Sequence, residues 1–273
     1  GVPEGRYQEI DISPDGKRAI IVQFATQSDS TLWIADLDRG GATRFTNERA
    51  TNFLGLWSPD STRIVYSSDV HGPRDLMEKP ASGATPAQTF YASPALFKDA
   101  RAWSPDGKTV LFEQLDPKTN RDIWAASTSD HTVSVYIQTP FADASPVFSP
   151  DSKWVAFASD ESGHSEIYID AFPTPKGKYK VTHIGSAIVF WRKDGKELLF
   201  VNGEGTAVYV VDVTIGATVT TGKPRKLFDL PKSFVTLSPT PDFQRILAAF
   251  NTKENATSSL TLIFDWTSTL KKK

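Results

Sequence analysis

The sequence predicts an all-β fold, a six-bladed β-propeller with four-stranded antiparallel blades. A turn of the Ser-Pro-Asp-Gly type recurs along the whole chain, and short apolar runs typical of buried strands surround every copy. The turn aspartates are spaced by 45, 46, 45, 43 and 48 residues, which is the length of one propeller blade; they are Asp15, Asp60, Asp106, Asp151, Asp194 and Asp242. No stretch shows helical periodicity.

Each turn combines residue types that reverse a chain sharply. Proline presets φ, aspartate accepts a hydrogen bond from the backbone two residues on, and glycine adopts a positive φ. The fifth copy lacks the proline and the sixth lacks the glycine, but both keep the aspartate. Because a residue that recurs in every blade specifies the blade, we interpret the aspartates as structural. The six turns are residues 13–16, 58–61, 104–107, 149–152, 192–195 and 240–243.

Three strands per repeat follow from the apolar runs, and a weaker fourth fits before the next repeat, as at 42–45 and 225–228. The innermost strand ends in a large residue two positions before the proline site: Ile12, Trp57, Trp103, Phe148 and Trp191, with Pro239 in the last copy. Second strands are predicted at 19–22, 64–66, 110–112, 154–157, 198–200 and 246–250. Third strands are predicted at 32–36, 75–77, 122–124, 166–169, 208–211 and 260–264. Trp57, Trp103, Trp154 and Trp191 are interpreted as packing between blades rather than as sugar-stacking platforms.

Closed all-β folds reach this length as one unit, so residues 1–273 are predicted to form a single propeller domain. The chain starts in the innermost strand of the first blade and runs out soon after the third strand of the sixth. Blade six is therefore predicted to be incomplete, with 267–270 as a candidate for a short closing strand and an exposed edge as the alternative.

Composition limits the classes of partner. Thirty basic and 32 acidic residues leave a net charge of −2, so no field favours nucleic acid, and none is expected as a partner. No run approaches the roughly 20 apolar residues of a membrane span, and we expect no membrane contact by this domain itself. The chain has no cysteine, which excludes disulfides and thiol chemistry. Any export signal or anchor is expected to lie outside this chain.

The repeated Trp/Phe-Ser-Pro-Asp-Gly-Lys turn, the apolar strand after it, and the following Ser-Asp and Ile-Tyr resemble the WD-repeat-like propeller unit of TolB-type proteins. Residues 57–66 and 148–168 match that unit best, and the resemblance covers nearly the whole chain. Propellers of this kind occur as periplasmic scaffolds, as sensor regions of bacterial membrane serine/threonine kinases, as lids of prolyl-oligopeptidase-like peptidases and in some lyases. The segment 262–266 resembles the ends of the kinase-linked sensors. The resemblance implies a bacterial, periplasmic or extracellular monomer.

Catalytic motifs are lacking, and we predict no catalytic residue, no cofactor and no metal site. There is no Gly-x-Ser-x-Gly elbow and no phosphate-binding glycine loop. The histidines lack the close spacing of metal ligands on one element and are interpreted as exposed. One loop, with Asp160, Glu161, His164 and Glu166, could hold a divalent cation, although a turn formed by Asp160 and Gly163 is the favoured interpretation.

Binding residues are best sought where the repeats disagree. The incoming loops, which lead into the innermost strands, differ from copy to copy and would surround the mouth of the central channel on the top face. Aromatic, cationic and anionic groups that converge there are typical of a ligand site, with unselected loop residues as the alternative. The predicted ligand-binding residues are Arg6, Tyr7, Asn52, Phe53, Lys98, Asp99, Arg101, Asp143 and Phe234. Arg74 and Arg121, on outer loops, are weaker candidates for recognising an anion.

We therefore expect a noncatalytic sensor or scaffold propeller that recognises a protein, a peptide or a small ligand at the channel mouth. One alternative is an enzyme of the propeller lyase or hydrolase type that uses the central channel. Another is the lid domain of a prolyl-oligopeptidase-like peptidase. These functions rest on analogy of fold.

Overall fold

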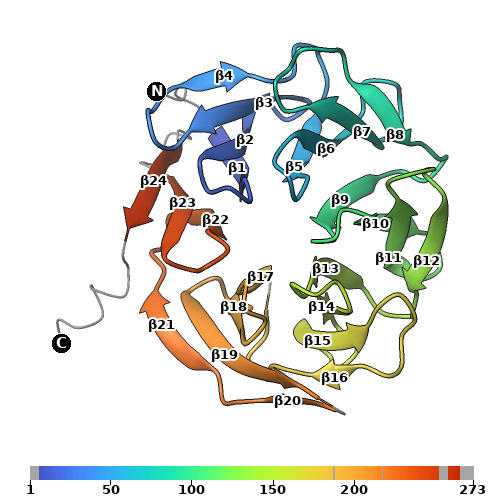
Figure 1. Ribbon diagram of the computed structural model, residues 1–273, viewed down its shortest axis with the longest axis vertical. Helices are drawn as coiled ribbons and strands as arrows, with labels where there is room; N and C mark the ends of the chain where they lie inside the picture. Colours follow the sequence, from blue (N-terminus) through green and yellow to red (C-terminus); the bar gives the residue numbers. More distant parts are fainter. Residues whose placement is uncertain (1–5, 187, 217, 252–257, 265–273) are drawn as a thin grey trace. The chain divides into compact units, whose positions relative to one another are not determined.

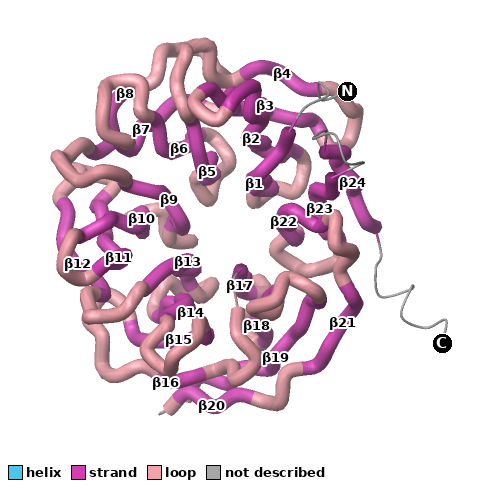
Figure 2. The backbone as a smooth tube through the Cα atoms, turned by 180° about the vertical axis from the view of Figure 1, so that it is seen from behind, coloured by secondary structure: helices cyan, strands magenta, loops and turns pink. Residues whose placement is uncertain are grey.

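The computed structural model describes residues 6–186, 188–216, 218–251 and 258–264. This part of the chain is all-β: it forms six antiparallel sheets that follow one another in sequence, as the colours of Figure 1 show. Figure 2, coloured by secondary structure, shows strands and loops only. None of the described elements is a helix able to cross a membrane.

The strands agree with the predicted order within each repeat. The innermost strands are β1 (Arg6–Ile12), β5 (Asn52–Trp57), β9 (Lys98–Trp103), β13 (Asp143–Phe148), β17 (Ile188–Trp191) and β22 (Phe234–Pro239). The second strands are β2 (Arg18–Thr26), β6 (Arg63–Ser68), β10 (Thr109–Asp116), β14 (Trp154–Ser159), β18 (Glu197–Val201) and β23 (Arg245–Asn251). The third strands are β3 (Asp29–Asp36), β7 (Asp75–Pro80), β11 (Asn120–Ser127), β15 (Glu166–Ala171), β19 (Ala207–Ile215) and β24 (Ser258–Phe264).

Outer strands complete the first five sheets. They are β4 (Ala42–Arg44), β8 (Gln88–Tyr91), β12 (Val133–Ile137), β16 (Tyr179–Lys180), β20 (Val219–Thr221) and β21 (Arg225–Asp229). The fifth sheet has two of them, because β19 is long enough to pair with β21 along its first half and with β20 along its second. The sixth sheet has three described strands, β22, β23 and β24, as the incomplete blade requires. The candidate closing strand at 267–270 lies outside the described residues.

The chain divides into two compact units, which we describe separately: residues 1–100 with 233–272, and residues 101–232. In both units the core lies between neighbouring sheets. Ile20 and Leu32 of the first sheet pack with Trp57 and Ile64 of the second. In the other unit, Trp191 closes a similar cluster between the fourth and fifth sheets. Trp57, Trp103 and Trp191 are buried and Trp154 packs against a core cluster, in agreement with the packing role predicted for them.

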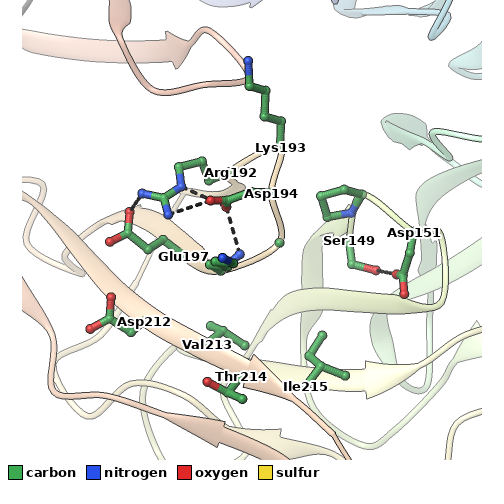
Figure 3. A pocket seen from close by; sticks show the side chains of 13 residues that line it. Ser149, Asp151, Arg192, Lys193, Asp194, Glu197, Asp212, Val213, Thr214 and Ile215 are labelled. Atoms are coloured by element: carbon green, nitrogen blue, oxygen red, sulfur yellow. Dashed lines mark hydrogen bonds and ion pairs between the residues drawn. The ribbon is translucent and has the colours of Figure 1, made fainter.

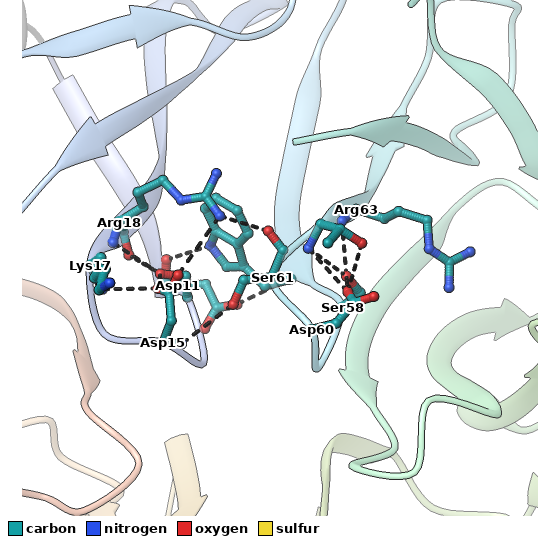
Figure 4. Close-up of polar contacts among 11 residues, drawn as sticks. Asp11, Asp15, Lys17, Arg18, Ser58, Asp60, Ser61 and Arg63 are labelled. Carbon is teal, nitrogen blue, oxygen red and sulfur yellow. Dashed lines mark hydrogen bonds and ion pairs between the residues drawn. The ribbon is translucent and has the colours of Figure 1, made fainter. Parts of the chain in front are cut away.

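Hydrogen bonds within the repeated turn show why its aspartate is constant. In the first copy Ser13 Oγ donates to Asp15 Oδ1 (2.6 Å), Lys17 N donates to the same oxygen (3.0 Å), and Arg18 N donates to Ser13 Oγ (3.0 Å) (Figure 4). The second turn repeats this arrangement around Asp60, and its hydroxyl donors lower the pKa of that carboxyl to about 2. The interpretation of the turn aspartates as structural is confirmed.

The fifth turn keeps its aspartate by a different route. Arg192 stands where the other turns have serine or threonine, and its guanidinium donates to Asp194 through Nε (2.9 Å) and Nη2 (2.8 Å). Lys196 N supplies the usual backbone donor (3.0 Å). The same carboxylate is therefore satisfied by a charged donor instead of a hydroxyl.

Polar contacts also join neighbouring blades at the turns. Trp57 Nε1 donates to the carbonyl of Asp11 (3.1 Å), and Trp57 N lies 3.4 Å from Asp11 Oδ2. Arg18 lies over the Trp57 ring, 4.7 Å from its centroid, and donates to Ser61 O (2.7 Å) (Figure 4). Burial raises the pKa of the Asp11 carboxyl to about 7. Asp11 is thus a titratable group at the seam between the first two sheets.

The last turn residue has a left-handed backbone, which permits a direct test. Gly107 has φ +77° and open space where a Cβ would project, so Gly107→Ala carries only the backbone penalty. We expect this variant to lower the free energy of unfolding by about 1–2 kcal/mol in urea denaturation. The control is Lys108→Ala at the next, exposed position, where a change below about 0.5 kcal/mol is expected. Equal effects of the two variants would contradict this account of the turn.

The Asp11 seam predicts a pH dependence. The folded-state pKa of about 7 exceeds the ordinary value of 3.8, so the folded protein binds the extra proton and loses stability as pH rises between those values. Asp11→Asn should therefore be more stable than wild type above pH 7, by on the order of 1 kcal/mol because the side chain keeps some exposure, with the difference vanishing near pH 4.

Asp60→Asn should show the opposite trend. Since the pKa of Asp60 is lowered, the stability that its carboxylate contributes is present above about pH 4 and is lost as pH falls toward 2. Denaturation curves from pH 2 to 8 measure both.

Candidate ligand-binding surface

Burial divides the nine predicted binding residues. The side chains of five lie inside the protein: Tyr7, Asn52, Lys98, Asp99 and Asp143. Arg6 is exposed, and Phe53, Arg101 and Phe234 are partly exposed. The five buried side chains cannot touch a protein, a peptide or an organic ligand at the surface in this conformation without a rearrangement. A binding role for the set as a whole stays a prediction.

Lys98 is among the largest fully buried side chains of the described residues, and its ammonium organises an incoming loop. Lys98 Nζ donates to Asp75 Oδ1 (2.6 Å) and to the backbone carbonyls of Ser93 (2.6 Å) and Ala95 (3.0 Å). A buried ammonium needs such partners, because removing the charge from water is costly. The Lys98 ammonium therefore fixes the course of the loop before β9 by binding two of its carbonyls.

The same loop presents an apolar side chain to solvent. Leu96 is 75% exposed, although Ala95 before it accepts a hydrogen bond from Lys98 and Phe97 after it lies beside Arg74. Beside it, the Arg74 guanidinium lies 3.7 Å from the centroid of the Phe53 ring and 5.8 Å from that of Phe97, and donates to Asp99 Oδ1 (2.9 Å). The structure thus brings the predicted Phe53, Lys98 and Asp99 together around Arg74. Pairing with Asp99 weakens the case for Arg74 as an anion receptor.

Leu96 was not among the predicted residues, but its place in the repeat could have identified it. It lies seven residues before Trp103, as Phe141 lies seven before Phe148 and Ile184 seven before Trp191. Phe141 is 40% and Ile184 44% exposed, and both lie in the second unit. Three consecutive incoming loops therefore expose a large apolar side chain at one position of the repeat.

Arg101 and Arg121 share a buried carboxylate. Arg101 Nε lies 2.7 Å from Glu113 Oε1, and Arg121 Nη1 donates to Glu113 Oε2 (2.8 Å). Ser145 N, at a β-bulge of β13, donates to Glu113 Oε1 (2.7 Å). Glu113 is fully buried, so the two guanidiniums serve as its counter-ions. This arrangement links the third and fourth sheets.

A pocket of about 610 Å³ lies at the opposite, turn end of the fourth and fifth sheets (Figure 3). Pro150, Asp151, Asp194, Asp212 and Ile215 are among its lining residues. Its ionic groups pair with one another: Arg192 contacts Asp194 and Glu197, and Arg225 reaches Glu197 (3.0 Å) and Asp212 (3.3 Å). Three of the lining carboxylates, Asp194, Glu197 and Asp212, are thus already paired with Arg192 or with Arg225, which lies outside the lining.

The loop considered for a cation is satisfied by the protein itself. Glu166 is fully buried and accepts hydrogen bonds from Thr182 Oγ1 and Gly185 N, with His164 Nε2 2.7 Å from its Oε1. Asp160 accepts a hydrogen bond from Ala142 N, and Gly163 has φ +92°. Among the residues that the structure describes, no three His, Cys, Asp or Glu side chains gather as a metal-binding group. These contacts favour the turn interpretation.

Lys98 provides a test of the incoming-loop architecture. Replacing Lys98 by Met leaves Asp75 buried without its counter-ion, and we expect a loss of about 3–5 kcal/mol in chemical denaturation. The double variant Lys98→Met/Asp75→Leu should recover most of that loss, since it removes both charges. Lys108→Met, on an exposed lysine, is the control. A single-variant effect below about 1 kcal/mol would show that the ammonium does not hold the loop.

Comparisons with known proteins agree with this architecture. No protein-family model matches the chain. The chain is 23% identical over 203 residues to the uncharacterized peptidase YuxL of Bacillus subtilis, a match that covers 58% of this chain and 31% of that protein. The chain thus spans less than two thirds of this relative.

Two solved structures share the fold over almost the full chain. TolB from Acinetobacter baumannii superposes with a TM-score of 0.70 at 23% identity, over 96% of this chain and 61% of that one. The putative TolB from Agrobacterium tumefaciens gives a TM-score of 0.68 at 18% identity, over 94% of this chain and 90% of that one. Together with the six antiparallel sheets, these likenesses show that the chain has the β-propeller fold of TolB-type proteins.

Proposed function

We propose that this chain is a noncatalytic binding propeller, a sensor or scaffold that recognises a protein or peptide through its incoming loops, with residues 1–273 acting as one domain. The observation that carries the proposal is the exposure of Leu96, Phe141 and Ile184 at one position of three consecutive repeats. Their recurrence at one position of the repeat distinguishes them from singly scattered exposed apolar residues, which need no explanation. Protein interfaces use such side chains as buried anchors within a polar rim.

Preorganisation of the Leu96 loop supports the same proposal. The Lys98 ammonium binds two carbonyls of this loop and fixes its course before any partner arrives. A loop that is already ordered loses less conformational entropy on binding, which improves affinity for a given contact area. Arg74, Phe53 and Phe97 would form the rigid floor beside this anchor.

The alternatives predict different chemistry. An enzyme that used the channel would need reactive groups on the incoming loops, whereas Arg74, Lys98 and Arg101 are all engaged in ion pairs with Asp99, Asp75 and Glu113. A peptidase lid is favoured by the likeness to YuxL and would require a hydrolase domain in the parent protein. On the binding hypothesis, the chain works outside the cytoplasm of a bacterium as a monomer, as the resemblance to TolB-type propellers implies. A small ligand at the channel mouth is the remaining form of this hypothesis.

A peptide-display selection tests the proposal. Random peptides are selected on the immobilised chain, and the affinity of each recovered peptide is measured by fluorescence anisotropy against wild type, Leu96→Ser and Phe141→Ser/Ile184→Ser. We expect at least one of these variants to weaken binding by roughly tenfold or more, as loss of an apolar anchor does at protein interfaces.

The matched control is Val135→Ser on the outer strand β12. Val135 is 44% exposed, about as much as Ile184, but belongs to an outer strand and not to an incoming loop. Peptides that bind all variants equally would place recognition elsewhere on the surface. A selection that yields no peptide, together with stabilisation by a small molecule in a thermal-shift screen, would favour the small-ligand form instead.

A further inference from the structure

Two successive repeats place different charges at one structural position. Lys98 lies five residues before Trp103, and Asp143 lies five residues before Phe148. The acidic partner of Lys98 is Asp75, the residue before the buried Leu76 of β7; the residue before the buried Ile123 of β11 is Asp122. Lys98 and Asp75, which we call the first seam, therefore pair an ammonium with a carboxylate. Asp143 and Asp122, the second seam, place two carboxylates at the equivalent positions.

Both carboxylates of the second seam are buried, and each is satisfied on one oxygen only. Asp143 Oδ2 accepts from Thr139 Oγ1 (2.6 Å), and Asp122 Oδ2 accepts from Thr119 Oγ1 (2.7 Å) and Gln138 Nε2 (2.8 Å). Asp122 Oδ1 and Asp143 Oδ1 are buried and have no hydrogen-bond donor among the described residues. A buried carboxylate oxygen without a donor is costly, and neither carboxylate forms an ion pair with a described cation.

A third oxygen belongs to the same cluster. Ser159 pairs with Asp143 across β13 and β14, and its buried Oγ makes no hydrogen bond of standard geometry with the described residues. The hydroxyl still lies close enough to lower the pKa of the Asp143 carboxyl, while burial and the nearby charge of Asp122 raise it, and burial dominates. Lys178 also favours the charged form of Asp143, but its ammonium pairs with Glu161.

We propose that Asp122 and Asp143 bind a calcium ion, with Ser159 Oγ as a further ligand, in the place that the Lys98 ammonium takes in the preceding repeat. An all-oxygen donor set selects a hard cation, and two carboxylates balance a divalent charge. Calcium suits a buried site better than magnesium, because magnesium dehydrates reluctantly and usually keeps several waters. The ion would join β11 of the third blade to β13 of the fourth, as Lys98 joins β9 to β7.

The test is calcium binding by the whole chain after treatment with EDTA and removal of the chelator. Isothermal titration calorimetry at pH 7.5 should give one site per chain. Calcium at a hundredfold excess over its Kd should raise the Tm by roughly 5–10 °C. Asp122→Asn and Asp143→Asn should each abolish the binding heat and the Tm shift. Glu204→Gln, which neutralises an exposed carboxylate, should leave both unchanged.

The variant Asp143→Lys distinguishes loss of the calcium site from loss of folding. It copies the Lys98–Asp75 pair into the second seam, so the variant should unfold at the same or a higher temperature than EDTA-treated wild type and should ignore calcium. Absence of binding heat, with equal wild-type Tm values in calcium and in EDTA, would overturn the proposal. If stability in EDTA then also fell as pH rose from 5 to 8, the two carboxylates would share a proton instead of a metal ion.

Discussion

The burial of apolar sheet faces against the faces of neighbouring sheets is the constraint on which this architecture depends. A four-stranded sheet has two faces and cannot cover both alone, so each repeat requires its neighbours. The cluster that contains Ile20, Trp57 and Ile64 illustrates this, because it is formed by residues of both the first and the second sheet. Repeat proteins therefore distribute their stability over contacts between adjacent units.

Polar groups that lie in the same seams must then be satisfied without water. The groups that satisfy these buried polar atoms differ from one pair of neighbouring sheets to the next. Asp11 receives donors from Trp57, Lys98 pairs with Asp75, and Glu113 receives two arginines and a backbone N–H. Each of these contacts ties an innermost strand to the sheet beside it. The Lys98 ammonium also holds two carbonyls of the loop before β9, which is the loop that exposes Leu96.

The fold could be predicted from the sequence because its signals are local and repeated. Six turn aspartates and the apolar run after each of them locate the second strand of every blade, and the structure has β2, β6, β10, β14, β18 and β23 at those places. The strand β20 was not predicted, because Val219–Thr221 is too short and polar to stand out and pairs only since β19 extends past its usual length. The position of a strand within its repeat is set by nearby residues and can be predicted from them. The length of a third strand depends on which outer strands pair with it, and nearby residues do not show this.

Burial of the candidate binding residues could not be predicted in the same way. Charged residues are mostly exposed in proteins, so Lys98 in a variable loop indicates a surface position. Its burial depends on Asp75, 23 residues earlier, and on two carbonyls of the loop itself, and neither partner is marked by residue type. Predicting the Lys98–Asp75 ion pair requires knowing which residues of neighbouring repeats face each other, and the sequence alone does not give this.

Variation among the incoming loops consequently has two physical origins that lie two residues apart. Seven residues before the strand-ending aromatic, Leu96, Phe141 and Ile184 face solvent, and variation there changes what a partner meets. Five residues before it, Lys98 and Asp143 are buried in the seam, and variation there changes how two blades are held together. A substitution at the buried position can therefore alter binding only through the loop it supports, while one at the exposed position acts directly. Sequence differences between repeats are informative about ligands only after these two positions have been separated.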